Sequence, residues 1–167
     1  MTRLSHIAAI STFALIALTQ PAIGKAQLAP KPPAAARIDP AKGTLIANTT
    51  TLTITIGNIT QTRGQILMVL FDSQEAFDRG GKPVRATAVK VTENTATATF
   101  ANILHGRYGF KIVHDVNGDG KMDMNPFGMP IEPFAFSNNA VGNMGPAQWK
   151  DAAFDVAGPT TQTITFR

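Results

Sequence analysis

A run of oxygen-bearing side chains follows an apolar stretch in the second half of the chain. Asp115, Asn117 and Asp119 stand at alternate positions, a glycine follows, and Asp123 lies four residues beyond Asp119. This spacing matches positions one, three, five, six and nine of an EF-hand calcium loop, and the backbone carbonyl of Lys121 falls at position seven. We therefore expect a weak, structural Ca²⁺ site whose ligands are Asp115, Asn117, Asp119, the Lys121 carbonyl and Asp123.

Two features separate this loop from an EF-hand. Position twelve, where the bidentate glutamate belongs, is Pro126, and the chain enters the loop from an apolar strand pattern rather than from a helix. Glu132, a carbonyl or water would have to supply the missing ligand. Carboxylates this close repel one another unless a cation lies between them, which favours calcium. The alternative is a solvated turn in which the Asp and Asn side chains accept hydrogen bonds from their own backbone.

Histidine and serine residues near this loop raise the question of catalysis. His114 precedes the loop, is in phase with the inward face of its strand and has no second histidine near it in sequence. We expect a hydrogen-bonded structural role for it. Ser137 lies in Phe-Ser-Asn-Asn-Ala rather than in G-x-S-x-G, so we expect it to shape a turn. A triad of Ser137, His114 and Asp115 is disfavoured because adjacent residues of a strand point to opposite faces.

Alternating apolar and polar residues predict the strands that would position these side chains. Residues 51–56 alternate strictly between threonine and Leu or Ile, whereas residues 65–71 are apolar on both faces, as is typical of a central strand. A short helical turn should follow Ser73 as its N-cap. Further strands are expected at 84–91, 95–100, 107–114, 152–156 and 160–166, with 92–94 as a hairpin-sized connection. This pattern indicates an all-β fold, a single antiparallel Greek-key β-sandwich of about seven strands.

Two local patterns refine this expectation. Gly106 precedes Tyr108 by two residues, which is typical of a tyrosine corner whose hydroxyl bonds nearby backbone. The span from Asp115 to Trp149, after the next-to-last core strand, has no sustained period. Because its aromatic residues would be an aggregation hazard in water, we expect a long ordered loop that buries them, Phe127 included, over one end of the sandwich. Pro146 can begin a short helical turn within it.

The N-terminal part has the features of an export signal and a linker. Arg3 precedes an apolar run of about a dozen residues, Ile7 to Leu18, which is too short to span a bilayer comfortably. We expect a signal peptide over 1–26, a Pro/Ala-rich linker over 27–44 and the β-sandwich domain over 45–167. Cleavage would leave no transmembrane anchor, so the protein should be periplasmic or extracellular. The absence of cysteine excludes disulfides, thiolate metal sites and cysteine nucleophiles.

The distribution of charge argues against a nucleic-acid role. The formal net charge of +4 arises before residue 45, where five basic residues oppose one acidic residue. From residue 45 onward, ten Lys or Arg balance ten Asp or Glu. No basic stripe remains for phosphates, so no nucleic-acid partner is expected.

The motifs along the chain resemble those of domain-of-unknown-function family 2141, small exported bacterial proteins. The resemblance rests on Arg-Gly-Gln at 63–65, Gly-Arg-Tyr at 106–108, the Asp-rich loop at 114–123, Phe-Ser-Asn-Asn-Ala-x-Gly at 136–142 and Asp-Ala-Ala-Phe at 151–154. It covers about residues 52–166. It implies export and an immunoglobulin-like sandwich of transthyretin-like or carboxypeptidase-regulatory-like type. It brings no established activity and no catalytic residue.

Three functions are open at this point. The first, which we expect, is an exported non-enzymatic accessory or binding module of unknown ligand, supported by the calcium loop, with an envelope protein or a glycan as partner. The second is a carbohydrate- or peptide-binding module that uses Trp149, Phe127 or Phe134 as a stacking platform, and exposure of Trp149 would favour it. The third is a small hydrolase built on the Ser-His-Asp set.

Overall fold

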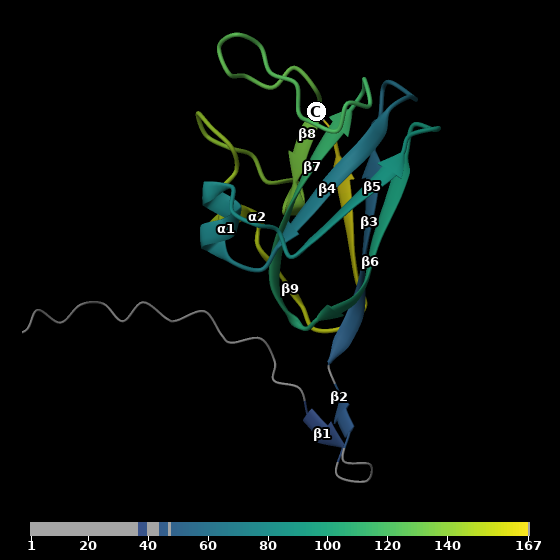
Figure 1. The fold of residues 1–167 in the computed structure, drawn as a ribbon, viewed down its shortest axis with the longest axis vertical. Helices are drawn as coiled ribbons and strands as arrows, with labels where there is room; N and C mark the ends of the chain where they lie inside the picture. Colours follow the sequence, from purple (N-terminus) through teal and green to yellow (C-terminus); the bar gives the residue numbers. More distant parts are fainter. Residues whose placement is uncertain (1–36, 40–43, 47, 167) are drawn as a thin grey trace, which may run out of the picture. The chain divides into compact units, whose positions relative to one another are not determined.

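The computed structural model describes residues 37–39, 44–46 and 48–166 (Figure 1). The expected signal peptide and most of the expected linker lie outside these residues. The described chain is an all-β fold in which a three-stranded and a five-stranded sheet pack together, which confirms the expected sandwich. No helix in this part of the chain has the length and apolar character needed to cross a membrane.

The smaller sheet has the strand order β10-β3-β6. Its strands are β3 (Thr49–Gly57), β6 (Ala96–Leu104) and β10 (Thr160–Thr165). In the central strand β3, Leu52, Ile54 and Ile56 are fully buried and the intervening threonines are only partly so. The strict alternation in the sequence therefore corresponds to one face on the core and one facing outward.

The larger sheet has the order β5-β4-β7-β8, and β9 also pairs with β7. Its strands are β4 (Gln65–Phe71), β5 (Arg85–Lys90), β7 (Gly106–Asp115), β8 (Phe134–Phe136) and β9 (Phe154–Val156). β7 is the longest of them. One of its edges pairs with β4, and the other pairs first with β9 and then with β8. The long loop between β7 and β8 thus leaves and re-enters the same sheet.

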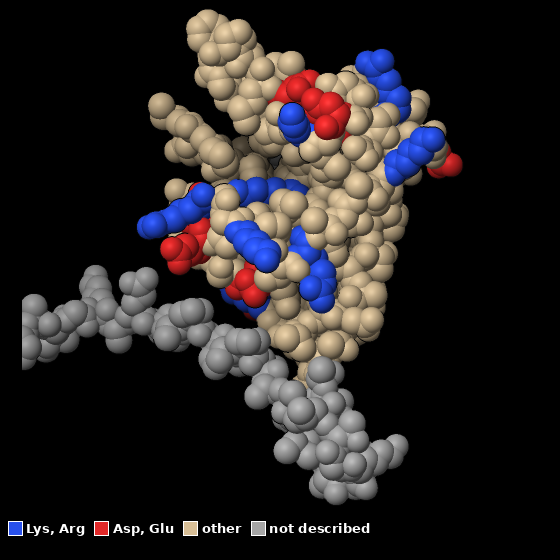
Figure 2. Space-filling model, in the orientation of Figure 1, with Lys and Arg blue, Asp and Glu red and all other residues tan. Residues whose placement is uncertain are grey.

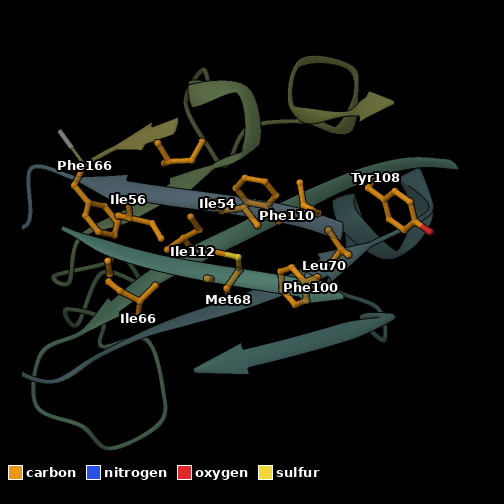
Figure 3. Close-up of a cluster of buried hydrophobic side chains, with 14 of the residues drawn as sticks. Ile54, Ile56, Ile66, Met68, Leu70, Phe100, Tyr108, Phe110, Ile112 and Phe166 are labelled. Atoms are coloured by element: carbon orange, nitrogen blue, oxygen red, sulfur yellow. The ribbon is translucent and has the colours of Figure 1, made fainter. Parts of the chain in front are cut away.

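The core lies between the two sheets (Figure 3). Ile54 and Ile56 of β3 face Met68 and Leu70 of β4 and the apolar residues of β7 across this space. Each such side chain that is fully buried stabilises the fold by about 1.5–3 kcal/mol relative to exposure. The Tyr108 hydroxyl donates a hydrogen bond to the Leu104 carbonyl at 2.9 Å, as predicted for a tyrosine corner. The sheets therefore form a rigid frame for the loops at their ends.

A second, smaller apolar cluster covers the outer face of the larger sheet. It contains α1 (Gln74–Arg79) and α2 (Trp149–Ala152), which contact each other. As expected, the Ser73 hydroxyl accepts the Ala76 N–H at the start of α1. The buried members of the cluster are Phe71, Phe77, Phe136, Ala147 and Ala152. The helices are short because each supplies only a few apolar side chains to this layer.

Three details differ from the sequence predictions. The strands expected to form a hairpin around 92–94 lie in different sheets, because β5 pairs with β4 while β6 pairs with β3. The sandwich is not wholly antiparallel, since β10 runs parallel to β3, a pairing that requires the long intervening crossover. Two short strands, β1 (Arg37–Asp39) and β2 (Thr44–Ile46), pair antiparallel. They lie at the end of the expected linker and the start of the expected domain.

Candidate functional site

Asp115, the last residue of β7, closes the Asp-rich loop with its carboxylate. The side chain is fully buried. Oδ1 accepts the N–H groups of Gly118 and Asp119 at 2.7 and 3.1 Å, and Oδ2 accepts the Gly120 N–H and the Gln65 side-chain amide, both at 2.8 Å. Gln65 lies directly opposite on β4. The loop therefore turns around one carboxylate that the strand register holds in place.

The other polar side chains of the loop also bond within it. Asn117 accepts the Asp119 N–H at 3.0 Å and donates its amide to Asp123 at 2.9 Å, while Asp119 accepts the Lys121 N–H at 2.9 Å. These are the side-chain-to-backbone bonds of consecutive Asx turns. The alternative interpretation of the sequence, a self-capped turn, thus describes the geometry of this loop.

Glu132, which lies just before β8, fastens the far end of the same loop. Its side chain is buried, and its two oxygens accept the N–H groups of Val116 at 2.8 Å and Asp123 at 3.0 Å. The Ile131 N–H in turn donates to the Asp123 carbonyl at 3.0 Å. The segment that returns to β8 is therefore bound to the Asp-rich loop.

The pKa values of Asp115 and Asp123, two carboxyl groups of the loop, are shifted in opposite directions. Burial alone would raise the pKa of Asp115, but the hydrogen bonds from Gln65 and from the N–H groups of residues 120, 118 and 119 outweigh it, so the pKa is lowered. Burial, followed by the neighbouring carboxylates of Asp119, Glu132 and Asp115, raises the pKa of Asp123. The loop therefore favours the charged form of Asp115 and disfavours that of Asp123.

The five expected calcium ligands fall into two groups. Asp115 has both oxygens occupied by N–H donors, whereas Asn117, Asp119, Lys121 and Asp123 lie at or near the surface. Among the described residues, no three acidic or histidine side chains lie close enough together to share a metal ion. An ion held by all five groups would require Asp115 to release hydrogen bonds to its own loop. The outer groups alone offer a partial, hard-oxygen ligand set.

His114 has the structural role that its position predicts. It is 1% exposed, and its Nε2 donates a hydrogen bond to the Arg63 carbonyl at 2.9 Å, because a carbonyl can only accept. Its ring stacks on Phe166 with centroids 6.1 Å apart. Both contacts tie the end of β7 to neighbouring segments.

Ser137, Asn138 and Asn139 form a clamp that joins three elements. The fully buried Ser137 hydroxyl accepts the Phe110 N–H at 3.0 Å and donates to the Ala152 carbonyl at 2.7 Å. The Asn139 amide donates to the Thr163 carbonyl, and its oxygen accepts the Thr165 N–H, both at 2.9 Å, so it continues the β10 ladder. The Asn138 amide bonds the carbonyls at the end of α2. Both asparagines have positive φ, which Asn tolerates better than most residues.

The Ser-His-Asp set does not converge. Ser137 bonds the backbone of Phe110, while His114 lies four residues further along β7, roughly 13 Å away at the usual strand rise. Each side chain is engaged with a different part of the backbone. The geometry therefore contains no nucleophile–base pair at these three residues.

The three candidate stacking aromatics differ in exposure. Trp149 is half-buried, packs edge-on against Phe77 with centroids 5.7 Å apart, and donates its backbone N–H to Asp78 at 2.8 Å. Phe127 is 87% exposed and Phe134 is 42% exposed. The expectation that the loop buries its aromatic residues is wrong for Phe127 and Phe134. The loop of Phe127 turns outward on hydrogen bonds to the Asn125 side chain, and Phe134 lies on the strand at the end of its sheet.

A groove of about 500 Å³ runs along β8. Its lining consists of Phe134, Ala135 and Phe136 of β8, residues 130–133 before this strand, and residues 139–142 with Gly145 after it. Thr165 of β10 also reaches it. Its volume falls within the usual range for ligand-binding pockets. The segments that line the groove are therefore held in place by the Asp-rich loop and by the Ser-Asn-Asn clamp.

The two loops beside this groove carry nearly all the exposed large apolar side chains of the described chain. On the loops and on β8 between them, these residues are Met124, Phe127, Met129, Ile131, Phe134, Val141 and Met144. The remaining exposed large apolar residue, Leu104, lies in β6. Figure 2 shows two uncharged lobes at this end of the molecule, next to a patch of acidic side chains. This surface was not predicted from the sequence. The available signal was the concentration of methionines, four of the six, between residues 122 and 144 in a span without periodicity.

Comparisons with known proteins give one result. No curated protein and no solved structure matches the chain. Residues 54–165 match the family described as "Uncharacterized protein conserved in bacteria (DUF2141)", which spans both sheets, the Asp-rich loop and the clamp. The chain therefore belongs to the DUF2141 family, as its strand and loop motifs predicted.

Proposed function

We propose that this protein is an exported, non-enzymatic binding module whose ligand site is the groove along β8. The observation that carries the proposal is that three exposed apolar residues, Ile131, Phe134 and Val141, line this groove. Four more, Met124, Phe127, Met129 and Met144, lie on the segments that flank it. Soluble proteins rarely leave large apolar side chains contiguous and exposed unless the surface binds something. Export rests on the N-terminal sequence, and it places the ligand in the periplasm or outside the cell.

The side chains around the groove favour recognition over catalysis. Glu132 is the only titratable residue of its lining, and both of its oxygens already accept backbone N–H groups. The serine and histidine nearest to it are fixed by structural hydrogen bonds. A site lined by Pro, Ile, Phe, Ala and Val binds through apolar contact area, with backbone groups to orient the ligand.

Titration with the neutral apolar dye Nile red tests this site. We expect saturable binding with a stoichiometry of one, and a loss of at least tenfold in affinity for Ile131→Asp and Val141→Asp, since both side chains line the groove and are exposed. Leu104→Asp is the matched control, because Leu104 is 45% exposed but does not line the groove. Absence of saturable binding, or equal losses in the control, would refute the assignment.

We also propose that the Asp-rich loop takes up Ca²⁺ weakly, as a support for the groove. The supporting observation is the closeness of the acidic side chains around Asp123. Burial first raises the pKa of Asp123, and the carboxylates of Asp119, Glu132 and Asp115 raise it further, a repulsion that a cation would relieve. The outer oxygens of Asn117, Asp119, Asp123 and the Lys121 carbonyl would hold the ion, which supplies charge neutralisation rather than chemistry.

Thermal unfolding with calcium and with chelator tests this second proposal. At a hundred times the dissociation constant, the ion should add about 2.7 kcal/mol to the free energy of unfolding. Asp119→Asn and Asp123→Asn should remove the shift, and Asp155→Asn, an exposed residue of β9, should keep it. No shift at millimolar Ca²⁺ would exclude the proposal.

A further inference from the structure

β8, the strand that lines the groove, has an edge without a partner strand among the described residues. β8 pairs with β7 and with no other strand of the described residues. The His114 N–H bonds the Pro133 carbonyl at 2.8 Å, so the pair His114–Pro133 is a hydrogen-bonded one. Hydrogen-bonded and non-hydrogen-bonded pairs alternate along an antiparallel ladder. The N–H and C=O of Phe134, which lies opposite Val113, therefore point away from β7 and toward the groove.

The shape of the groove suits one added strand. Residues 130–133, which precede β8, and residues 139–142 with Gly145, which follow it, line the groove together with β8. Of the two phenylalanines of β8, Phe134 is exposed and Phe136 is buried. A second copy of this sandwich would bring its own flanking loops into the same space. A single extended segment can enter between the loops, pair with β8 and place alternate side chains against apolar walls.

The charges around the groove indicate the character of that segment. Inside it, the one carboxylate is already bound to backbone N–H groups, so the groove itself suits uncharged side chains. In the neighbouring Asp-rich loop, residues 115–123 carry three carboxylates against one lysine, and Asp119 is exposed. Figure 2 shows a patch of acidic side chains next to the uncharged lobes. A Lys or Arg next to an apolar stretch would therefore be attracted to this loop, whereas an anionic lipid surface would be repelled.

The loops beside the groove can adapt to different side chains of a bound segment. Three of their exposed apolar residues are methionines, Met124, Met129 and Met144, which lie outside the lining of the groove itself. Unbranched, polarizable Met side chains are common where a surface accepts varied apolar partners. Main-chain hydrogen bonds to β8 would supply affinity that does not depend on the sequence of the partner.

From these observations we infer that the groove binds an extended polypeptide segment by β-strand addition to β8, and that it favours alternating apolar residues flanked by a basic residue. This inference rests on the proposed function and names its ligand class. The bound segment extends the five-stranded sheet by one strand at its β8 edge.

Calorimetry with defined peptides tests the mode of binding. The probe is a peptide that alternates valine and threonine and carries a lysine at each end. Two versions of it are N-methylated at alternate residues, so that each blocks one edge of the strand. We expect the parent to bind, one methylated version to lose at least tenfold in affinity, and the other to stay within about threefold. A version with terminal glutamates should bind at least threefold more weakly at low salt.

Two variants of one residue isolate the contribution of the protein backbone. Phe134→Pro removes the N–H that faces the groove without removing a hydrogen bond to β7, an edge position that proline tolerates. Phe134→Ala removes the ring and keeps the N–H. We expect Phe134→Pro to bind the peptide at least fivefold more weakly than Phe134→Ala, with both variants retaining the wild-type circular dichroism. Leu104→Asp should bind as the wild type does.

Several results would overturn this inference. If Nile red binds in the groove but the peptide does not, the binding module stands and strand addition fails. Equal affinities for the two methylated peptides, or for the two Phe134 variants, would also refute it. Binding to phosphatidylcholine vesicles in place of peptide would assign the apolar loops to a lipid surface. Concentration-dependent dimerisation that Phe134→Pro abolishes, without peptide binding, would assign the edge to a second copy.

Discussion

Replacing Asp115 with Asn should destabilise the fold more than any other single-atom change in the Asp-rich loop. The carboxylate accepts four hydrogen bonds while fully buried. In Asp115→Asn, the amide oxygen can keep two of them, and Gln65 can rotate its own amide to accept one from the new NH₂ group. The Gly120 N–H cannot rotate and would face another donor.

The cost follows from the loss of one bond and the weakening of the others. Hydrogen bonds to a charged group contribute about 1.5–3 kcal/mol, and neutral ones about 0.5–1.5 kcal/mol. We therefore expect the free energy of unfolding to fall by roughly 2–4 kcal/mol at pH 7. For a domain of this size, that corresponds to a fall in Tm of about 6–15 °C. Urea unfolding in excess chelator measures the difference without any contribution from bound cations.

The pH dependence provides a second, independent check. The folded-state pKa of Asp115 is lowered, so its contribution is complete above the unfolded pKa and is lost as the pH falls through the folded value. The stability difference between wild type and Asp115→Asn should therefore shrink below about pH 4. The control is Asp119→Asn at an exposed position, where the new amide oxygen can still accept the Lys121 N–H. This variant should change the free energy of unfolding by less than about 0.5 kcal/mol. A small effect of Asp115→Asn at pH 7, or a difference that stays constant down to pH 2.5, would contradict the argument.

Two further substitutions test the frame that carries the loop. Tyr108→Phe removes the 2.9 Å hydrogen bond to the Leu104 carbonyl, so the free energy of unfolding in urea should fall by about 1–2 kcal/mol. A fall below about 0.3 kcal/mol would show that the tyrosine corner does not stabilise this sandwich. Gly64→Ala would make a Cβ clash with the Asp115 carbonyl oxygen at a positive φ, so it should lower Tm far more than Gly145→Ala, where a Cβ meets nothing within 4 Å. Equal Tm values for the two variants would contradict this packing.

The strands of the sandwich could be predicted because each strand is specified by the pattern of its own residues. Period-two alternation in β3, the apolar run of β4 and the glycine before Tyr108 each specify an element through their own residues. Sheet membership was not predictable in the same way. β5 and β6 are neighbours in sequence with a turn-like connection between them, yet they join different sheets, because pairing is decided by which strand buries the facing side chains.

The site was predictable only where side chains act on nearby backbone. Asp115 and Asn117 bond N–H groups within five residues of themselves, and this is the range that sequence spacing can describe. The bonds from Asn139 to Thr163 and Thr165 span more than twenty residues, and nothing in the spacing indicates them. The groove depends on such long-range contacts, so its residues became visible only in the folded chain.

Glu132 connects the Asp-rich loop to the groove, and this connection can be tested directly. Its two oxygens hold Val116 and Asp123, while its neighbours Ile131 and Pro133 line the groove. In Glu132→Gln, the amide nitrogen would face one of these N–H groups, so we expect a loss of about 1–2 kcal/mol in stability. Because residues 130–133 would then lose one of their hydrogen bonds to the Asp-rich loop, Nile red should bind several-fold more weakly even at a temperature where the variant is fully folded.

The comparison that decides this point is with Tyr108→Phe, which should cost a similar amount of stability at the opposite end of β7, far from the groove. If both variants weaken dye binding equally, general loosening of the fold explains the effect. If Glu132→Gln loses stability but binds the dye as the wild type does, the groove does not depend on the Asp-rich loop. A loss of dye binding in Glu132→Gln alone would mean that the buried carboxylates of Asp115 and Glu132 determine the shape of the groove. Closing a turn at this position does not by itself require two buried charges.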